Sequence, residues 1–328
     1  MENYNIKKLL RIEDEPFELI DDKKSHEILI KDIAYFMNYL KSFYEEWALN
    51  EDFITLPIKS IYSIDEIKGD FRIMPCIVHK DRKIKAVKII GTNEENHFIK
   101  DKISVGKMFL LDWHDNYIYA AIDACILSSF RTAAISVLAY TLYDHKNTTI
   151  SIIGTGRIGF YTSLILHKYL GINTLYCYDI NIKNKNNFLE LCKIYAPDLK
   201  LIIEDKLEKV ISKTKSAFLC TDSGNSILKE DNIQDLEFIS SIGADADNLS
   251  ELDSSLIESF NIITDSKQSI LLGDMQKWEK EKLLKKDAVI ELKDLINKEK
   301  LNSKTLFIST GVALQDAIIA KYIYDVNS

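Results

Sequence analysis

The sequence predicts an α/β protein, in which a doubly wound parallel sheet follows a smaller α+β domain. Two patterns indicate this arrangement. From residue 149 onward, short apolar runs alternate with helical segments, which is typical of a parallel sheet with helices on both faces. The first 120 residues instead carry a long helical pattern followed by closely spaced strand-like runs. A glycine-rich turn at residues 154–159 opens the second half.

Composition bounds the function classes. The chain has 328 residues, enough for two domains, and 46% hydrophobic with 28% charged residues is a globular balance. The net charge of -8 argues against a nucleic-acid partner, which would require clustered lysine and arginine. The 5 cysteines form no C-x-x-C pair, and no histidine lies at metal-ligand spacing from them. We therefore expect reduced thiols in a cytoplasmic protein without a metal site.

No membrane segment is expected. The N-terminus lacks the apolar core of a signal peptide. The most apolar stretch, residues 124–143, contains Arg131 and several hydroxyl side chains. A bilayer span would have to bury that charge at high cost, so the stretch is interpreted as a packed amphipathic helix.

The first half should contain one long helix and a set of strands. Residues 28–49 repeat apolar positions at helical spacing, which predicts one apolar face on one helix. Asp115 and Asn116 are typical of a hairpin turn. Strands are expected at residues 72–78, 84–90, 108–112 and 117–122.

The second half should form the parallel sheet. Its strand cores are expected at residues 150–153, 174–178, 201–203, 217–220, 238–242 and 262–264. Helical segments separate them, as a doubly wound sheet requires. A final helix is expected over residues 311–324, after Ser309 and Thr310, which can cap it.

The glycine-rich turn has the G-x-G-x-x-G spacing of a Rossmann dinucleotide-binding unit, with Gly154, Gly156 and Gly159. It follows an apolar strand and opens a helix, which is the context that the motif requires. Gly154 permits the tight turn, Gly156 lets the backbone approach a pyrophosphate, and Gly159 allows close packing of helix and strand. The helix N-terminus then faces the phosphates. The alternative is a glycine turn in a domain that binds no nucleotide.

Asp179 ends the next predicted strand, where such folds place a ribose-binding acid. Its carboxylate can accept both ribose hydroxyls and would repel a 2′-phosphate. No arginine follows it, so NAD is favoured over NADP. The alternative is an aspartate that caps the next helix.

Three further blocks resemble the ornithine cyclodeaminase / μ-crystallin family. Residues 128–136 read S-S-F-R-T-A-A-I-S, similar to the family's R-T-A-A-x-S helix start. Residues 242–245 with 251–252 are similar to its G-x-D…E-L segment. Residues 305–316 resemble its C-terminal F-x-S-x-G…D signature. The likeness runs from about residue 72 to the C-terminus.

The resemblance implies a division of labour along the chain. Residues 1–130 and 307–328 would form a substrate-binding and dimerisation domain, and residues 131–306 the NAD-binding Rossmann domain. It also implies a homodimer, a small amino-acid substrate, and hydride transfer between the α-carbon of that substrate and a nicotinamide.

The resemblance also implies the site residues. Arg72 and Arg131 match the family's carboxylate-binding arginines, Lys88 its active-site lysine, which also contacts substrate, and Asp245 its active-site aspartate. The residues expected to contact the cofactor are Arg131, Thr132, Gly154, Thr155, Gly156, Arg157, Ile158, Asp179, Thr221, Gly243 and Asp245.

These residue types suit the oxidation of an amino acid to an imine. Guanidinium groups bind a carboxylate bidentately, and a desolvated Lys88 can act as acid or base. Arg131 and Lys88 lie in apolar runs, so each needs an internal acid or a bound anion; a structural salt bridge is the alternative. Asp245 lies at a strand end and can orient the amine or activate water, although aspartate also favours local turns.

The substrate stays open at this level. Leu249 and Asn248 stand where the family usually has lysine and glycine, and residues 91–94 differ from the N-G-H-P of cyclodeaminases. Residues 72–75 and 88–91 are closer to the family's N-(2-amino-2-carboxyethyl)-glutamate dehydrogenases, whereas residues 243–245 are closer to its cyclodeaminases. A cyclodeaminase would recycle its hydride, whereas a dehydrogenase would release NADH. The rival class is a μ-crystallin-like carrier without turnover, which would not need all four site residues.

Overall fold

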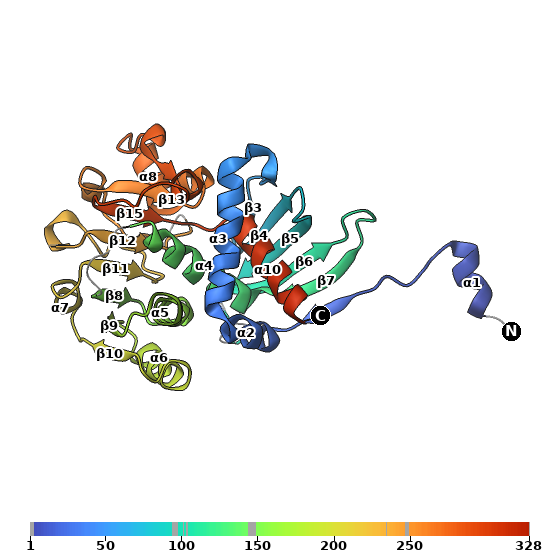
Figure 1. Cartoon of the computed structure of the whole chain (residues 1–328), viewed down its shortest axis with the longest axis horizontal. Coiled ribbons are helices and arrows are strands. Elements are labelled where there is room, and N and C mark those ends of the chain that lie inside the picture. The colour runs from blue at the N-terminus through green and yellow to red at the C-terminus, as the bar shows by residue number, and fades with distance from the viewer. Residues whose placement is uncertain are drawn as a thin grey trace.

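The computed structural model describes residues 3–93, 98–100, 102, 104–143, 149–233, 235–246 and 249–327. It contains two sheets, one of 7 strands and one of 8 strands, with helices between them (Figure 1). The expected α/β class is confirmed. Glu94, Asp247 and Asn248 lie outside the described residues, so the departures noted at residues 94 and 248 have no structural account.

The predicted long helix is in fact two helices, and this expectation was wrong. They are α2 (Asp22–Lys31) and α3 (Ile33–Leu49). Asp32 separates them because its carboxylate accepts a hydrogen bond from the Tyr35 N–H at 2.9 Å. Aspartate favours this capping position over a helix interior, so the chain starts a new helix here. Ahead of them, α1 (Asn3–Leu10) stands away from the body of the molecule (Figure 1).

The sheet of 7 strands contains the four predicted strands of the first half as β4 to β7. In chain order its strands are β1 (Glu18–Ile20), β2 (Ile54–Thr55), β3 (Ser60–Ile64), β4 (Ile67–Val78), β5 (Ile84–Thr92), β6 (Ser104–Leu111) and β7 (Ile118–Asp123). The predicted hairpin turn is present, with Asn116 at φ 63° and the Asp112 N–H bonded to the Tyr117 carbonyl at 2.8 Å. The sequence did not predict β1, β2 or β3.

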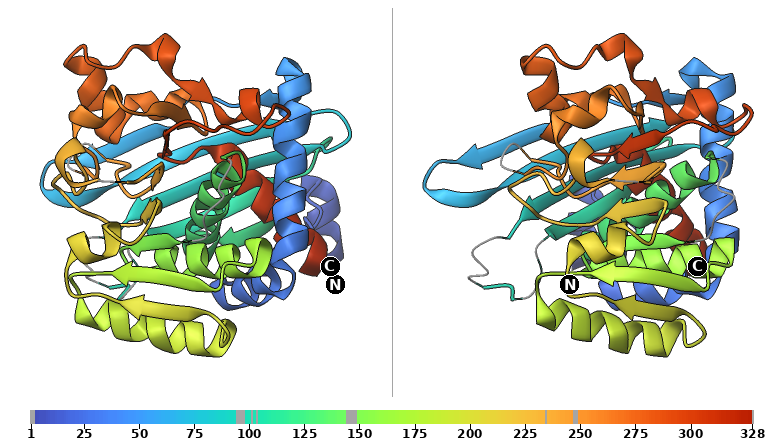
Figure 2. Two further views of the ribbon diagram at one scale, coloured as in Figure 1. Left: turned by 60° about the vertical axis from the view of Figure 1, so that its left-hand side comes forward. Right: turned by 90° about the vertical axis from the view of Figure 1, so that its left-hand side faces the viewer.

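The period of two along β4 and β5 sets the direction of two basic side chains. In β4, Arg72 and Met74 are buried, and in β5 Lys88 is buried between Ala86 and Ile90. The pairing of Met74 with Lys88 puts these side chains on one face, because paired residues of neighbouring strands point the same way. That inner face is covered by α10 (Ala313–Asn327), which lies across β4, β5 and β6 (Figure 2).

The apolar stretch after β7 forms α4 (Ala124–Thr141), which lies between the two sheets (Figure 1). Its length and composition would suit a membrane span, but 83% of it is buried inside the protein. The expectation of an amphipathic helix was wrong, because residues on every side of the helix are buried. It is a core helix of the molecule.

The sheet of 8 strands is parallel throughout, in the order β10-β9-β8-β11-β12-β15-β13-β14. Its strands are β8 (Ile150–Ile153), β9 (Thr174–Tyr178), β10 (Lys200–Ile203), β11 (Ser216–Leu219), β12 (Phe238–Ser241), β13 (Asn261–Thr264), β14 (Ile290–Glu291) and β15 (Thr305–Ile308). All six predicted strand cores are present. The strand order reverses between β8 and β11, the point at which open α/β sheets bind ligands.

Short helices connect these strands. The α-helices are α5 (Arg157–Leu170), α6 (Ile182–Tyr195), α7 (Leu207–Ile211), α8 (Gly273–Lys280) and α9 (Leu292–Leu295). The 3-10 helices between these strands are η2 (Glu230–Asn232), η3 (Ser254–Ile257), η4 (Lys267–Leu271) and η5 (Lys286–Ala288), whereas η1 (Glu51–Phe53) lies earlier, between α3 and β2. The expected domain division at residue 307 falls inside β15, which pairs with β12 and β13 along its whole length. The final helix begins at Ala313, after the left-handed Gly311 (φ 75°).

Candidate active site

The three glycines of the dinucleotide loop occupy different surroundings. A Cβ on Gly154 (φ 94°) would lie 2.5 Å from the Cys220 carbonyl oxygen, and a Cβ on Gly159 would lie 2.1 Å from the Gly154 carbonyl oxygen. The turn and the packing of α5 on β8 therefore require glycine at both positions. A Cβ on Gly156 would meet none of the described residues within 4 Å, so the N-terminus of α5 opens onto free space. That space is where a pyrophosphate would lie.

Asp179 lies beside this loop and is 8% exposed. Its carboxylate accepts hydrogen bonds from the Thr155 N–H at 2.7 Å, the Thr155 hydroxyl at 3.0 Å and the Asn181 N–H at 2.7 Å. It does not cap the following helix, because the Asn181 side chain accepts the hydrogen bonds there, from the N–H groups of Lys183 and Asn184. The acid at the end of β9 is thus joined to the glycine loop.

The side chains of three residues expected to contact the cofactor interact with other residues of the chain. The Arg157 guanidinium donates to the Cys125 Sγ at 2.9 Å and so points toward the start of α4. Ile158 follows it in the first turn of α5 and packs partly against the core. The Thr132 hydroxyl donates to the Ser128 carbonyl one turn earlier in α4. Neither Ile158 nor Thr132 lies within 4 Å of a Cβ on Gly156.

A buried acid that the sequence analysis did not assign to the site holds the next two strand ends together. Glu251 accepts hydrogen bonds from the N–H and hydroxyl of Thr221 at 2.9 and 2.7 Å, and from the Gly243 N–H at 3.0 Å. Thr221 follows β11 and Gly243 follows β12, and a Cβ on Gly243 would lie 1.8 Å from the Thr221 carbonyl oxygen. Glu251 therefore links the segments that follow β11 and β12, between the glycine loop and Asp245.

In a second group of buried residues, the Asp316 carboxylate forms ion pairs with two cations. The Lys88 Nζ lies 2.6 Å from the Asp316 Oδ2, and the Arg131 Nε lies 3.2 Å from the Asp316 Oδ1. Arg131 also donates to the Gln315 Oε1 at 3.2 Å, and Lys88 to the Ser128 hydroxyl at 3.3 Å. Burial lowers the pKa of Lys88 to about 7, against the opposing pull of Asp316 and with the help of the Arg131 charge. The arrangement has one positive charge more than Asp316 can neutralise.

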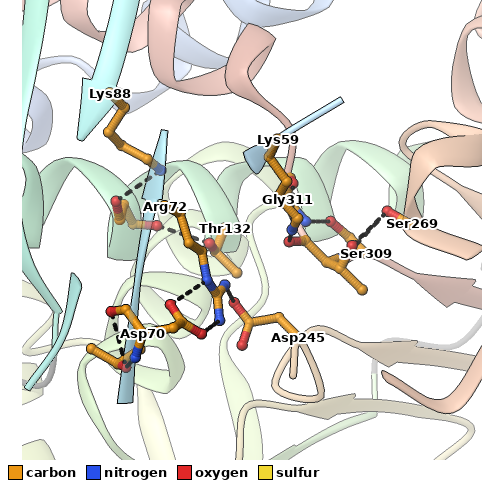
Figure 3. A network of polar contacts seen from close by, with 12 residues as sticks. Lys59, Asp70, Arg72, Lys88, Thr132, Asp245, Ser269, Ser309 and Gly311 are labelled. Atoms are coloured by element: carbon orange, nitrogen blue, oxygen red, sulfur yellow. Dashed lines mark hydrogen bonds and ion pairs between the residues drawn. The ribbon is translucent and has the colours of Figure 1, made fainter. Parts of the chain in front are cut away.

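A third cation, Lys59, was not predicted. Its Nζ donates to the carbonyl oxygens of Thr310 and Gly311 at 2.8 and 3.3 Å (Figure 3). Burial lowers the pKa of Lys59 to about 8, although the charge of Asp245 acts in the opposite direction. The only sequence signal is a lysine within the mainly apolar residues 56–61, because its partners lie far along the chain.

The backbone at Gly311 lies against two of the three cations, Lys59 and Arg131. A Cβ on Gly311 would lie 2.1 Å from the Arg131 Nη1, so the guanidinium lies directly against the same peptide that Lys59 binds. We call Lys59, Lys88 and Arg131 the cationic cluster. Lys59 directly precedes β3, Lys88 lies in β5 and Arg131 lies in α4. Each of them contacts a residue between positions 309 and 316.

Arg72 is close to the cationic cluster but is occupied by two acids. Its Nε and Nη2 donate to Asp70 at 2.8 and 3.0 Å, and its Nη1 donates to the Asp245 Oδ2 at 2.8 Å (Figure 3). Although burial raises the pKa of Asp245, the charges of Arg72 and Lys59 outweigh it and hold that pKa below its usual range. The Asp245 side chain is 37% exposed, so it is an accessible ionised carboxylate.

The fold and the site together define the class of protein. A dinucleotide loop lies at the switch point of a Rossmann sheet, and a partly unneutralised cationic cluster faces Asp245 a few strands further along the same edge. This is the arrangement of a dinucleotide-dependent oxidoreductase that acts on a small carboxylate. Among the described residues, no group of His, Cys, Asp and Glu could hold a metal ion.

Residues 23–328 match the model of the ornithine cyclodeaminase/mu-crystallin family, and the chain belongs to this family. The match begins about fifty residues before the point expected from sequence motifs. A Delta(1)-pyrroline-2-carboxylate reductase of Bacillus thuringiensis subsp. konkukian is 26% identical over 89% of this chain and 90% of its own. An N-((2S)-2-amino-2-carboxyethyl)-L-glutamate dehydrogenase of Staphylococcus aureus is 24% identical over 76% and 77%.

Solved structures share the fold over almost the whole chain. The Thermococcus litoralis Delta(1)-pyrroline-2-carboxylate reductase, in complex with NADH and L-proline, gives a TM-score of 0.84 at 22% identity, covering 94% of this chain and 96% of that one. A dimeric archaeal alanine dehydrogenase with bound NAD gives 0.81 at 20% identity, covering 94% and 95%. The expected Rossmann fold, family and class of enzyme, an NAD-dependent oxidoreductase of amino-acid chemistry, are confirmed.

Proposed function

We propose that this enzyme interconverts a small α-amino acid and the corresponding α-imino acid, with NAD as hydride acceptor and NADH as donor. In the oxidative direction the α-carbon loses a hydride to the nicotinamide and the nitrogen loses a proton. The observation that carries the proposal is the cationic cluster facing Asp245 at the carboxyl edge of the Rossmann sheet. The binding of NADH and L-proline by a reductase of the same fold supports it.

The cofactor would lie along that edge. Asp179 suits the adenosine ribose, and the open space at Gly156 suits the pyrophosphate, with Thr155, Arg157 and Ile158 around it. Thr221 and Gly243 then lie on the nicotinamide side, with Asp245 just beyond. The buried Asp179 carboxylate favours NAD over NADP, because a 2′-phosphate would bring like charges together. The bound cofactor supplies the hydride acceptor; the residues named here bind and orient it.

The substrate carboxylate would complete the cationic cluster. Lys88 and Arg131 share the single charge of Asp316, and Lys59 binds only carbonyl oxygens, so a bound carboxylate supplies the missing negative charge. Buried cations are costly until they are paired, which favours an anion at this point. We assign Arg72 mainly to the positioning of Asp245, because its Nε, Nη1 and Nη2 each donate a hydrogen bond to Asp70 or Asp245.

Asp245 would act on the substrate nitrogen. Its ionised carboxylate accepts a hydrogen bond from the amine and stabilises the positive charge that develops on that nitrogen as the α-carbon becomes an iminium centre. The proton lost from the nitrogen can pass through Asp245 to solvent, because this side chain is 37% exposed. Lys88 is buried behind the carboxylate, so we assign it to binding rather than to proton transfer to solvent.

We expect a homodimer, located in the cytoplasm. Its two copies would pack through the outer face of the sheet of 7 strands. Among the described residues no helix covers this face, and the strand register directs several exposed apolar side chains to it: Leu19, Phe71, Ile89 and Ile118. Tyr62 stacks on Phe71 with ring centroids 5.0 Å apart. Exposed apolar side chains gathered on one uncovered sheet face favour a protein partner, and a second copy of the chain is the expected one. Residues 1–130 and 307–328 would thus serve substrate binding and dimerisation.

The test is turnover with a set of substrates, followed by the absorbance of NADH. We expect NADH formation with an α-amino acid and NADH consumption with a cyclic or open-chain α-imino acid. A recycling cyclodeaminase would release ammonia without net NADH. A protein that binds NAD but turns over none of these compounds would be the non-catalytic carrier, and the proposed function would be wrong.

A further inference from the structure

A cavity of about 240 Å³ adjoins the cationic cluster. Lys59, Thr310 and Gly311 line part of it, and the Lys59 ammonium donates to the carbonyl groups of the other two. Its remaining wall is mostly hydrocarbon. We call this cavity the apolar pocket. Four aliphatic residues line it: Ile58, Ile61, Leu271 and Leu272.

Strand order places the apolar pocket on the far side of Asp245 from the dinucleotide loop. The loop follows β8, Asp245 follows β12, and Leu271 and Leu272 follow β13, which lies beyond β15 in the sheet. A substrate whose carboxylate lies on the cationic cluster, and whose nitrogen faces Asp245, therefore has the nicotinamide on one side. Its side chain is left to extend toward the apolar pocket.

The polar groups near the apolar pocket are already bonded. Gln268 donates its side-chain amide to the Leu56 carbonyl at 2.8 Å. The nearby acid Asp265 is fully buried and accepts from the Ser309 hydroxyl at 2.5 Å and the Gln315 amide at 2.7 Å. Within the described part of the chain, the wall offers no free acid for a distal ammonium. Lys59 is its only cation, and the substrate's own carboxylate uses it.

We propose that the apolar pocket selects an amino or imino acid with a hydrocarbon side chain, and that Ile58, Ile61, Leu271 and Leu272 determine this specificity. The inference rests on the proposed function and adds the substrate class to it. Size supports the assignment: an apolar cavity of about 150 Å³ is enough to hold a benzene ring. A cavity of 240 Å³ therefore accommodates an aliphatic chain of several carbons or a ring.

The first test is a series of substrates of increasing length, from alanine through 2-aminobutyrate and norvaline to norleucine, compared with ornithine and glutamate. Burial of each methylene is worth ~0.8 kcal/mol, so kcat/KM should rise about fourfold per methylene. Ornithine and glutamate should fall at least about tenfold below norleucine, because their charged ends find no partner on the hydrocarbon wall. Preferential turnover of ornithine or glutamate would overturn this inference while upholding the proposed function. Absence of turnover with every compound would overturn both.

The second test changes the wall itself. Leu271→Asp should lower kcat/KM for norleucine at least about tenfold and change that for alanine less than about threefold, since the alanine methyl does not reach the wall. Ile58→Asp, at another exposed point of the wall, should act in the same way. Leu283→Asp is the matched control, because Leu283 is similarly exposed but lies outside the apolar pocket. Equal losses for norleucine and alanine in both wall variants would overturn the inference.

Discussion

At the scale of residues, the site depends on an unequal count of charges. Asp316 is fully buried and contacts both Lys88 and Arg131, so two cations share one carboxylate. Burial of the Lys88 ammonium is the main reason why its pKa lies near 7, and the neighbouring Arg131 charge lowers it further. Binding of a substrate carboxylate removes the imbalance. The buried, incompletely paired positive charge therefore favours binding of an anionic ligand.

Lys59 should make substrate capture depend on pH. Its pKa of about 8 lies below the usual value for lysine, so its charge is present below about pH 8 and is lost as the pH rises through that value. We expect kcat/KM to fall on the alkaline side, with a contribution from this ionisation. Lys59→Met should raise KM at least about tenfold with a smaller change in kcat, because one partner of the carboxylate is removed.

The conservative variant separates charge from shape. Lys59→Arg keeps a positive charge at all accessible pH values, so it should move the alkaline decline of kcat/KM to higher pH. The measurement is the pH profile of kcat/KM for the three proteins. A Lys59→Arg profile identical to that of the parent enzyme would show that another group causes the decline.

Asp245 should be needed for turnover but not for cofactor binding. Asp245→Asn retains the shape but removes the charge that stabilises the iminium nitrogen, so kcat should fall by about two orders of magnitude or more. The affinity for NAD, measured by titration calorimetry, should be unchanged. Asp198→Asn, at an exposed position far along the chain, serves as the control. Full activity of Asp245→Asn would refute the assigned role.

At the scale of elements, the N-terminus of α5 allows packing and binding to be tested separately. A Cβ on Gly156 meets free space among the described residues, and its φ of -70° is open to alanine. Gly156→Ala should therefore fold with unchanged or slightly higher stability. It should nevertheless weaken NAD binding at least about tenfold, because the methyl group would occupy the space for the pyrophosphate.

Gly159→Ala is the contrasting variant. Its Cβ would lie 2.1 Å from the Gly154 carbonyl oxygen, so α5 must shift away from β8 at a cost of about 1–3 kcal/mol in the free energy of unfolding. Thermal denaturation without ligand measures the difference between the two variants. If Gly156→Ala bound NAD as tightly as the parent protein, the pyrophosphate would have to lie elsewhere.

Local pattern predicted most elements, and long-range pairing explains the exceptions. Of the six predicted strands of the parallel sheet, β8, β11, β12 and most of β13 are buried on both faces, so each contains a short apolar run. β14 has only 2 residues and β1 has 3, so their identity as strands depends on neighbours distant in sequence. The break at Asp32 was missed because the apolar spacing continues across it.

At the scale of the whole molecule, the site lies where the chain passes between the two sheets. It crosses once at α4 and once at residues 309–316, which lead into α10 (Figure 1). Arg131 belongs to the first crossing and Asp316 to the second. The two rigid helices therefore set the distance between the cationic cluster and the edge of the Rossmann sheet.

The site was only partly predictable because its residues meet across the whole chain. Lys88 and Arg131 stood out as charges in apolar runs, and both lie in the cluster. Lys59 gave little signal, since the carbonyl groups that it binds lie about 250 residues later. Arg72 was also identified from the sequence, but only the structure shows that Asp70 and Asp245 occupy it.

Two copies of the chain should associate through the outer face of the sheet of 7 strands. Ile89→Glu would place a charge in the centre of that face, where Ile89 is exposed in a single copy. We expect the dimer dissociation constant to rise at least about tenfold, measured by analytical ultracentrifugation. Ile194→Glu is the control, since Ile194 is also exposed but lies on α6 of the parallel sheet. A parent protein that is monomeric at all concentrations would contradict this assignment.

A crystal structure of the enzyme with NAD and an amino acid that it oxidises tests the central claim most directly. We predict that the substrate carboxylate contacts Lys59, Lys88 and Arg131, that its nitrogen faces Asp245, and that its α-carbon lies against the nicotinamide ring. A carboxylate bound away from the cationic cluster, or a nicotinamide ring directed away from Asp245, would contradict the account.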